Sequence, residues 1–447
     1  MSARAHPPVG QVLAVVSGNA LQFYDFVTYA FFAPEIGAAF FPAASPSTSL
    51  LASLATFGAG FLTRPLGAFV IGRFGDRAGR KPAMLLSFLL IGVAVIGLPL
   101  VPTYASLGVA APVLVVGFRL LQGFALGGEV GPSTAFLMEA APPRRRGLYV
   151  TLQATSADAA VGVAGLVGFV LAALLDKPAL EAWGWRVALL LGAVIVPFAF
   201  VARRSLTETL TLPGEANEIV PVASRRIVPL GLVLLATATT TNYLLEYMTT
   251  YARVTLGMST AVAFGATVVI GFCGLVCDTL GGWLSDRFGR KPVMVLPWVL
   301  LALAVFPAFW LLEHLRTRAA LYTASAVLAS ISTVSSATIL VAITESLPRR
   351  ARSGGLALIY ALAISVFGGS AQFFVTWLIR VTGNPLAPAW YMLSGVLVGL
   401  AALALLPETA PVKTARAGDA AAAQPPAGRG AAPQVAAVVP TPHEERP

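Results

Sequence analysis

The sequence predicts an all-α polytopic membrane protein built as two six-helix bundles, and three observations lead there. The chain of 447 residues is 57% hydrophobic and only 11% charged, whereas soluble domains carry about 25% charged residues. Its apolar residues gather in runs long enough to cross a bilayer, and one loop motif occurs in both halves. This composition excludes a soluble enzyme, a secreted scaffold and a disordered protein.

Twelve apolar runs are long enough to span a membrane, because a spanning helix needs about 20 mostly apolar residues. The expected helices are 11–41, 48–72, 82–102, 106–140, 148–175, 187–202, 227–252, 259–283, 293–312, 319–345, 354–380 and 388–406. The first run is too long and too polar for a cleaved signal peptide, so we expect it to remain in the mature protein.

The distribution of Lys and Arg predicts the orientation, because basic loops stay on the cytoplasmic side. With the N-terminus inside, 22 basic residues fall in inside segments and six in outside segments, and two lie within spans. We therefore expect both termini in the cytoplasm. High Ala, Gly and Arg usage and the lack of a targeting peptide predict a multi-pass protein of a bacterial inner membrane, in contact with lipid.

An internal repeat divides the chain. Residues 72–84 (GRFGDRAGRKPAM) match 282–294 (GWLSDRFGRKPVM) at eight of thirteen positions, and 139–145 (EAAPPRR) is echoed by 345–350 (ESLPRR). Repeats of this kind are typical of transporters. The predicted organisation is a cytoplasmic N-terminus (1–10), an N-terminal bundle (11–203), a cytoplasmic loop (204–226), a C-terminal bundle (227–406) and a disordered cytoplasmic tail (407–447).

Several other classes of site lack a sequence signal. The net charge of +10 comes from short clusters between apolar runs, which does not predict nucleic-acid binding. Cys273 and Cys277 lie four apart on one expected helix, and we interpret them as packing residues. We expect no metal, no cofactor and no catalytic residue, and the chain has no nucleotide-binding loop of the Gly-x-x-x-x-Gly-Lys-Ser/Thr type.

Two sequence motifs resemble those of the major facilitator superfamily. The two Gly-x-x-x-Asp-Arg-x-Gly-Arg-Lys loops follow the second and eighth expected helices, and 119–127 (RLLQGFALG) is similar to the family's second motif. The resemblance covers about 10–406. It implies alternating access by a protein that functions as a monomer.

Further segments resemble the metabolite–proton symporters, which include citrate, tricarballylate, oxoglutarate, shikimate and proline/betaine permeases. They are 18–26 (GNALQFYDF), 61–67 (FLTRPLG), 127–129 (GGE) and 203–209 (RRSLTET). The resemblance is strongest to the citrate and tricarballylate members. Those relatives usually have Glu where this chain has Gln22.

Charges inside the spans indicate function, because each costs about 2.5–3.5 kcal/mol at a helix centre. The candidates are Asp25, Arg64, Arg119, Glu129, Asp158, Glu246 and Asp278. An anionic substrate requires fixed positive charge, which Arg119 and Arg64 would supply. Polar side chains on the same helix faces complete the predicted binding site: Gln22, Tyr29, Gln122, Asn242 and Tyr243.

Proton coupling requires a group that takes up and releases a proton. All three histidines lie outside the spans, so a carboxyl group must serve: Asp25, Glu129 or Glu246. The alternative interpretation of these intramembrane charges is structural. In it, Arg64 and Arg119 pair helices, and so do Asp158 and Asp278. We expect the repeated loops to form gating ion pairs, through Gly72, Asp76, Arg77, Gly79, Arg80, Gly282, Asp286, Arg287, Gly289 and Arg290.

The resulting prediction is proton-coupled uptake of a small organic carboxylate such as citrate, tricarballylate or a dicarboxylate. Two alternatives use the same scaffold. One is a proton symporter for a zwitterionic osmolyte such as proline or betaine, and the other is an efflux antiporter of drugs or metabolites. A tail without heptads favours the carboxylate over the osmolyte.

Overall fold

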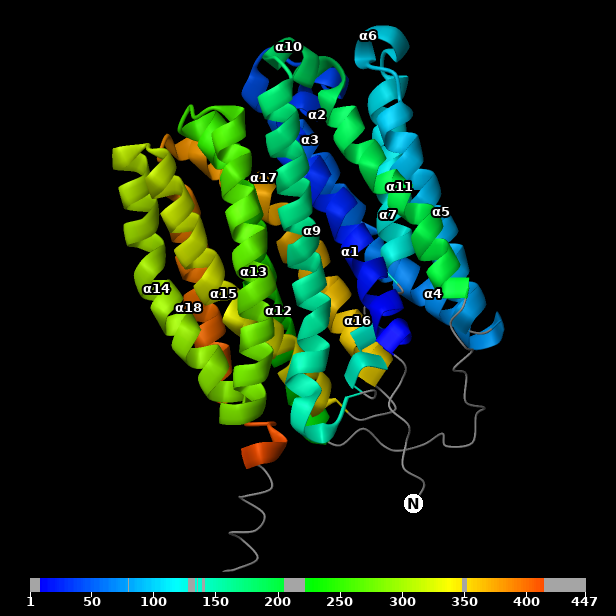
Figure 1. Cartoon of the computed structure of the whole chain (residues 1–447), viewed down its shortest axis with the longest axis vertical. Helices are drawn as coiled ribbons and strands as arrows, with labels where there is room; N and C mark the ends of the chain where they lie inside the picture. The colour runs from blue at the N-terminus through cyan, green and yellow to red at the C-terminus, as the bar shows by residue number, and fades with distance from the viewer. Residues whose placement is uncertain are drawn as a thin grey trace, which may run out of the picture.

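The computed structural model describes residues 9–78, 80–127, 133–134, 136–138, 141–204, 222–347 and 352–413. Within these ranges the chain is helical and has no β-strand. The long helices run roughly parallel to the longest axis of the molecule, and the start of α1 lies at the lower end of the view in Figure 1. We call the two ends of the bundle lower and upper, as they are drawn there.

Each half of the chain contributes one group of helices. The first half contains α1 (Val9–Phe31), α2 (Ala33–Phe40), α3 (Pro46–Leu62), α4 (Arg64–Ala78), α5 (Arg80–Leu100), α6 (Tyr104–Leu107), α7 (Ala110–Leu126), η1 (Pro143–Arg145), α9 (Arg146–Leu174), α10 (Lys177–Ala179), η2 (Leu180–Gly184) and α11 (Trp185–Arg204). The second contains α12 (Val222–Thr250), η3 (Tyr251–Thr255), α13 (Thr260–Phe288), α14 (Arg290–Leu315), α15 (Arg318–Ser346), α16 (Arg352–Ala363), η4 (Ile364–Gly368), α17 (Gly369–Thr382) and α18 (Ala387–Leu405).

Two of the expected helices are interrupted. The run 11–41 is divided at Phe32 into α1 and α2, and the run 48–72 is divided at Thr63 into α3 and α4. In each case a proline, Pro34 or Pro65, lies in the first turn of the new helix, where its missing N–H costs nothing. Three further segments, η2, η3 and η4, are π-helical turns.

Two predicted boundaries change. The second half begins as helix at Val222 rather than at 227. Of the run 106–140, the structure describes α6, α7 and a few later residues. The first seven residues of the expected disordered tail are ordered, because Glu408 accepts hydrogen bonds from the backbone N–H of Arg290 (2.8 Å) and Lys291 (3.1 Å). Residues 414–447 lie outside the described residues.

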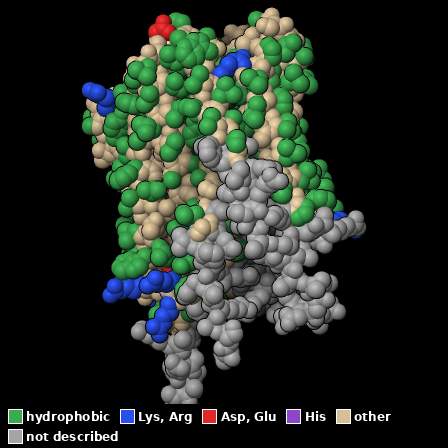
Figure 2. Space-filling view, turned by 45° about the vertical axis from the view of Figure 1, so that its right-hand side comes forward, with side chains coloured by type: hydrophobic (Ala, Val, Ile, Leu, Met, Phe, Trp, Pro, Cys, Tyr) green, Lys and Arg blue, Asp and Glu red, His purple; other side chains and the backbone are tan. Residues whose placement is uncertain are grey.

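The helices are long and apolar enough to cross a membrane. Among the described residues, eight helical stretches meet length and hydropathy criteria for a span, and Leu85–Leu100 and Ala110–Leu126 are shorter apolar helices. Apolar side chains cover most of the described flank in Figure 2, and Lys and Arg lie near its two ends. A lipid-facing flank between polar ends is the arrangement that a bilayer requires.

The two halves meet along helix pairs that approach closely. At α9–α13, a Cβ added to Gly271 would overlap the backbone of Gly162. At α3–α17, a Cβ added to Gly58 would lie 2.6 Å from the carbonyl oxygen of Gly369. Small residues allow such contacts between backbones in membrane proteins, and α9 and α13 lie side by side at the centre of Figure 1.

Candidate functional site

A cavity of about 110 Å³ lies between the two halves. Its walls come from α1, α9, α12, α13, α15, α16 and η4. The polar and aromatic side chains that line it are Asn19, Phe23, Gln153, Asp158, Thr239, Asn242, Tyr243, Glu246, Asp278, Thr333, Ser336 and Tyr360. Three of the predicted site residues, Asn242, Tyr243 and Glu246, therefore face this cavity.

Three of these cavity side chains have a buried acceptor atom that receives no hydrogen bond from any described residue: Oδ1 of Asn242, Oε2 of Glu246 and Oδ2 of Asp278. Glu246 is 7% exposed. Buried polar atoms are usually satisfied. These acceptor atoms are therefore available to a donor group that enters the cavity.

The predicted arginine on α7 belongs to a buried polar cluster. Arg119 is fully buried; its Nη1 donates to Oε1 of Gln122 at 2.6 Å and lies 3.6 Å from Oδ2 of Asp25. The amide of Gln122 donates to the same carboxylate. The guanidinium carbon is 3.8 Å from the ring centroid of Tyr29. The structure thus brings together four residues that the sequence analysis selected from two separate helices.

Arg119 still has unused donors. Its Nε and Nη2 are buried and have no acceptor among the described residues. Leaving a buried charged donor unsatisfied costs about 1–3 kcal/mol or more. The cluster therefore contains a guanidinium edge that an added carboxylate oxygen would satisfy.

The second predicted arginine, Arg64, lies at the start of α4 among aromatic rings. Its guanidinium carbon is 4.3 Å from the ring centroid of Phe61 and 4.8 Å from that of Phe26. Its Nε is buried without an acceptor, and it forms no ion pair with a described carboxylate. Cation–π contacts partly compensate for such a charge. Phe26 lies within 5.3 Å of Arg119 as well, so the two arginines share one aromatic neighbour.

An aromatic layer contacts both arginines and borders the cavity through Tyr243. We define this layer as Phe26, Tyr29, Phe57, Phe61 and Tyr243, whose rings contact one another with centroids 4.7–6.2 Å apart. Tyr243 also faces the cavity. Of the predicted binding and coupling residues, six lie outside the cavity lining: Gln22, Asp25, Tyr29, Arg64, Arg119 and Gln122. Glu129 lies outside the described residues.

Several cavity residues were not among the predicted site residues. Asn19 donates to the carbonyl oxygen of Gln153 (2.8 Å) and to Oγ of Ser156 (2.9 Å), which links α1 to α9. Gln153 and Tyr360 had only the weak signal of a polar side chain within an apolar run. Asp158 and Asp278 were visible as charges within spans, but we interpreted them as helix-pairing groups.

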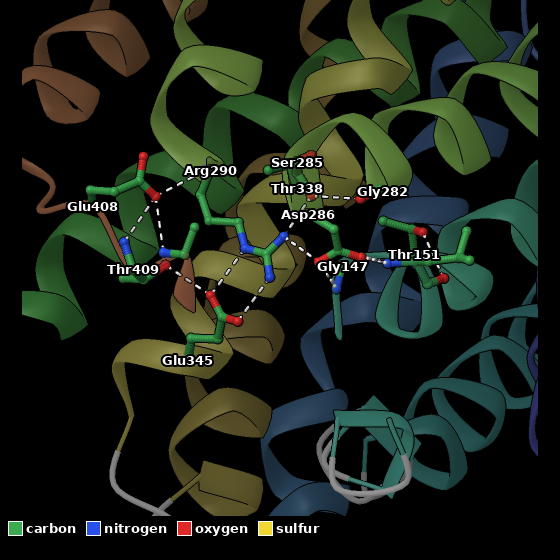
Figure 3. A network of polar contacts seen from close by, with 12 residues as sticks. Gly147, Thr151, Gly282, Ser285, Asp286, Arg290, Thr338, Glu345, Glu408 and Thr409 are labelled. Carbon is green, nitrogen blue, oxygen red and sulfur yellow. Dashed lines mark hydrogen bonds and ion pairs between the residues drawn. The ribbon is translucent and has the colours of Figure 1, made fainter. Parts of the chain in front are cut away.

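At the lower end, the second repeated loop forms a network that joins the halves (Figure 3). Asp286 accepts hydrogen bonds from the backbone N–H of Gly147 (2.8 Å) and Leu148 (2.9 Å), at the start of α9. Arg290 donates to Asp286 at 2.8 Å and to both oxygens of Glu345 at 2.9 and 3.1 Å. This lower network thus combines one contact between the halves with a buried, bidentate ion pair.

The other gating residues have different positions. Arg287 is exposed and lies outside the lower network, over the rings of Trp283 (5.5 Å) and Phe288 (5.7 Å). Gly282 lies against Thr151 of α9, and Gly289 has a φ of +101° at the turn between α13 and α14. Of the first loop, Gly79 lies outside the described residues. Gly72, Asp76, Arg77 and Arg80 are in helices, but their side chains lie outside the description.

An ion pair joins the halves at the upper end. Arg253 in η3 binds the carboxylate of Glu35 in α2 and donates to the carbonyl oxygen of Phe31 at 3.3 Å. Both side chains are largely buried, at 13% and 2% exposed. The sequence analysis used Arg253 only for orientation and missed this upper pair, since nothing in the sequence connects residues 218 positions apart.

Comparisons with known proteins agree with this architecture. A family model described as "Sugar (and other) transporter" matches residues 11–215 and again 214–417. The citrate-proton symporter of Klebsiella pneumoniae is 34% identical over 406 residues, which cover 89% of this chain and 91% of that protein. The alpha-ketoglutarate permease of Escherichia coli (strain K12) is 32% identical over 393 residues, 85% of this chain and 89% of that protein.

Solved structures show the same fold. A proton:xylose symporter of the major facilitator superfamily bound to 6-bromo-6-deoxy-D-glucose superposes with a TM-score of 0.71, at 17% identity, over 90% of this chain and 96% of that one. The matching family is one of transporters rather than enzymes, and its members are multi-pass membrane proteins. The chain therefore belongs to the sugar (and other) transporter family of the major facilitator superfamily.

Proposed function

We propose that this protein is a proton-coupled symporter that takes up a small organic carboxylate, such as citrate, tricarballylate or a dicarboxylate, across the bacterial inner membrane. The observation that carries the proposal is the buried guanidinium of Arg119, which has two nitrogens without an acceptor. A carboxylate matches this donor pattern because guanidinium groups bind its two oxygens together. The relatives named for citrate and alpha-ketoglutarate support the same substrate class.

A proton on Asp25 would switch the affinity of this site. While Asp25 is ionised, its carboxylate oxygen lies 3.6 Å from Arg119 and partly neutralises the charge of the guanidinium. The same carboxylate accepts a hydrogen bond from Gln122. Protonation removes that negative charge and weakens the pair. The guanidinium is then available to a substrate carboxylate, so that proton and anion bind together. Arg64, which contacts the same Phe26 ring, supplies a second positive charge.

The substrate would enter through the cavity and pass the aromatic layer. Tyr243 belongs to both, and its ring contacts η4, where a Cβ on Gly368 would lie 2.8 Å from Cε2 of Tyr243. π-Helical turns often mark functional positions in helices. We propose that Asn242 and Tyr243 first contact the substrate, and that movement of Tyr243 opens the path to Arg119 and Arg64.

Alternating access would use the two contacts that join the halves at opposite ends. The lower network links Asp286 to α9, and the upper pair links Arg253 to α2. We propose that the lower end faces the cytoplasm, in line with the distribution of basic residues. Opening toward either side then requires that one set of contacts break while the other holds.

A zwitterionic osmolyte is the second candidate, and the lining of the cavity favours it. Glu246, Asp158 and Asp278 together with Tyr243 and Tyr360 would suit the cationic end of betaine or proline. In that case the arginines that contact the aromatic layer would bind the single carboxylate of the osmolyte.

A binding panel separates the candidates. The purified transporter is titrated with labelled citrate, tricarballylate, succinate, oxoglutarate, proline and betaine, as wild type, Arg119→Gln and Arg318→Gln. Arg318 is exposed at the start of α15 and serves as the matched control. We expect one of the acids to bind wild type and Arg318→Gln alike and to lose about 100-fold in affinity in Arg119→Gln. Equal affinity in both variants would overturn the role of Arg119, and preference for betaine or proline would favour the second candidate.

A further inference from the structure

Two carboxyl groups face each other across the boundary between the halves. Asp158 lies on α9 and Asp278 on α13, the helix pair at the centre of the molecule. Each lies roughly 15–18 Å along its helix from the lower end, at 1.5 Å per residue. Both line the central cavity. They therefore lie well inside their helices and belong to different halves.

The packing of α9 on α13 brings these side chains together. At Gly162 and Gly271 the two backbones are in contact. One turn further along α13, the carboxylate of Asp158 occupies the space that a side chain at Gly274 would need. Gly274 lies four residues, or one turn, before Asp278. The two carboxyl groups are consequently within hydrogen-bonding reach of each other.

The surroundings provide no positive charge for this acid pair. No Lys, Arg or His is among the described residues that line the cavity. The titratable groups that face the pair are Glu246 and Tyr243 from α12, Tyr360 from α16, and Cys277 from α13 itself. Asp278 is 1% exposed, and its Oδ2 receives no hydrogen bond from a donor group of any described residue.

A hydrogen bond between two carboxyl groups requires a proton, because an ionised carboxylate can only accept. Two adjacent carboxylates without a nearby cation repel each other, so one of them remains protonated. Asp25 differs from this pair, because Arg119 compensates its negative charge and Gln122 donates a hydrogen bond to it. The Asp158–Asp278 pair is thus a place where a proton is needed while α9 and α13 are in contact.

We propose that Asp158 and Asp278 hold one shared proton while α9 and α13 are in contact, and release it when the two helices separate. On release, the O–H bond of the protonated carboxyl breaks, the proton passes to water in the cavity, and each helix carries one carboxylate. This proton is additional to the one proposed at Asp25. The inference rests on the proposed proton-coupled transport for its role in the cycle, but not for the existence of the shared proton.

Infrared difference spectroscopy tests the shared proton without any substrate. The purified protein is compared as wild type, Asp158→Asn, Asp278→Asn and Glu181→Gln, an exposed acid at the upper end that serves as the control. We expect a protonated-carboxyl carbonyl band that shifts in D₂O, is lost in both Asp variants and remains in Glu181→Gln. A band that persists in both Asp variants, or none in wild type, would overturn the proposal.

Transport measurements test the coupling. In proteoliposomes, the ratio of internal to external substrate at zero net flux is measured against the imposed pH difference. Since Asn donates to the remaining carboxylate without a titrating proton, we expect the number of protons carried per substrate to fall by one in Asp278→Asn. Unchanged stoichiometry with intact counterflow would overturn the coupling role. Absence of transport in wild type that still shows the infrared band would contradict the proposed function and leave the shared proton standing.

Gly274→Ala provides a second variant in which both carboxyl groups remain. The added methyl group overlaps the position of the Asp158 carboxylate, so it should separate the pair. We expect loss of the same infrared band in a protein that still shows counterflow. Retention of the band in Gly274→Ala would show that the protonated group is not this pair.

Discussion

Substitution of Asp286 by Asn should open the lower end of the transporter. In the structure one oxygen of Asp286 accepts from Gly147 and Arg290, and the other accepts from Leu148. Asn retains one acceptor and replaces the other with an NH₂ group, so the N–H of Leu148 loses its partner. Hydrogen bonds to a charged group contribute about 1.5–3 kcal/mol and neutral ones about 0.5–1.5 kcal/mol. The closed lower end should lose roughly 2–3 kcal/mol, a shift in population of about 30- to 150-fold.

Thiol labelling from the lower side measures this shift. A single cysteine is introduced at Ser336, which lines the cavity, after Cys273 and Cys277 are replaced by Ser. The labelling rate in inside-out vesicles should rise in Asp286→Asn. Arg287→Gln is the control, because the neighbouring Arg287 is exposed and lies outside the lower network. Equal labelling rates in the two variants would refute the assignment of Asp286 as a contact that closes this end.

Three further predictions address other parts of the molecule. Glu35→Gln removes the buried ion pair with Arg253, so labelling of the same cysteine from the upper side should increase; no increase would contradict a gating role for that pair. Arg64→Gln should reduce carboxylate uptake with the protein still in the membrane, as measured by initial rates, and full activity would remove Arg64 from the site. Burial alone would raise the pKa of the Glu408 carboxyl. Hydrogen bonds from four backbone N–H groups have a larger, opposite effect, so its pKa lies below the usual value. Its stabilising effect is therefore complete above the unfolded pKa and is lost as pH falls through the lower folded pKa. The thermal midpoint of Glu408→Gln should accordingly lie below that of wild type at neutral pH and converge with it in acid; a pH-independent difference would contradict this.

The helices were predictable because apolar segments that cross a membrane must form regular secondary structure. A segment of about 20 apolar residues must satisfy its own backbone hydrogen bonds in lipid, and only a helix does so. The interruptions at Phe32 and Thr63 were less visible, since their prolines lie inside otherwise continuous apolar runs. The order of residues 407–413 was missed because it depends on Glu408 and the start of α14, which are distant in sequence.

The candidate site was predictable as a set of residues but not as an arrangement. Each intramembrane charge is expensive, so Asp25, Arg119 and Glu246 could be selected from the sequence. Which charges meet depends on how each helix is rotated and where it crosses its neighbour. The contact between Asp158 and Asp278 follows from the close approach of α9 and α13 at their glycines, and helical periodicity alone does not determine such an approach.

Accumulation of a labelled carboxylate in proteoliposomes tests the central claim most directly. The acid that binds most tightly in the panel is supplied outside, with an inward proton gradient and with or without an uncoupler, and the internal pH is recorded in the same sample. We predict that the acid accumulates above its external concentration, that the interior acidifies with its entry, and that the uncoupler abolishes the accumulation. Entry that only equalises the two concentrations, unaffected by the gradient or by the uncoupler, would contradict proton-coupled symport.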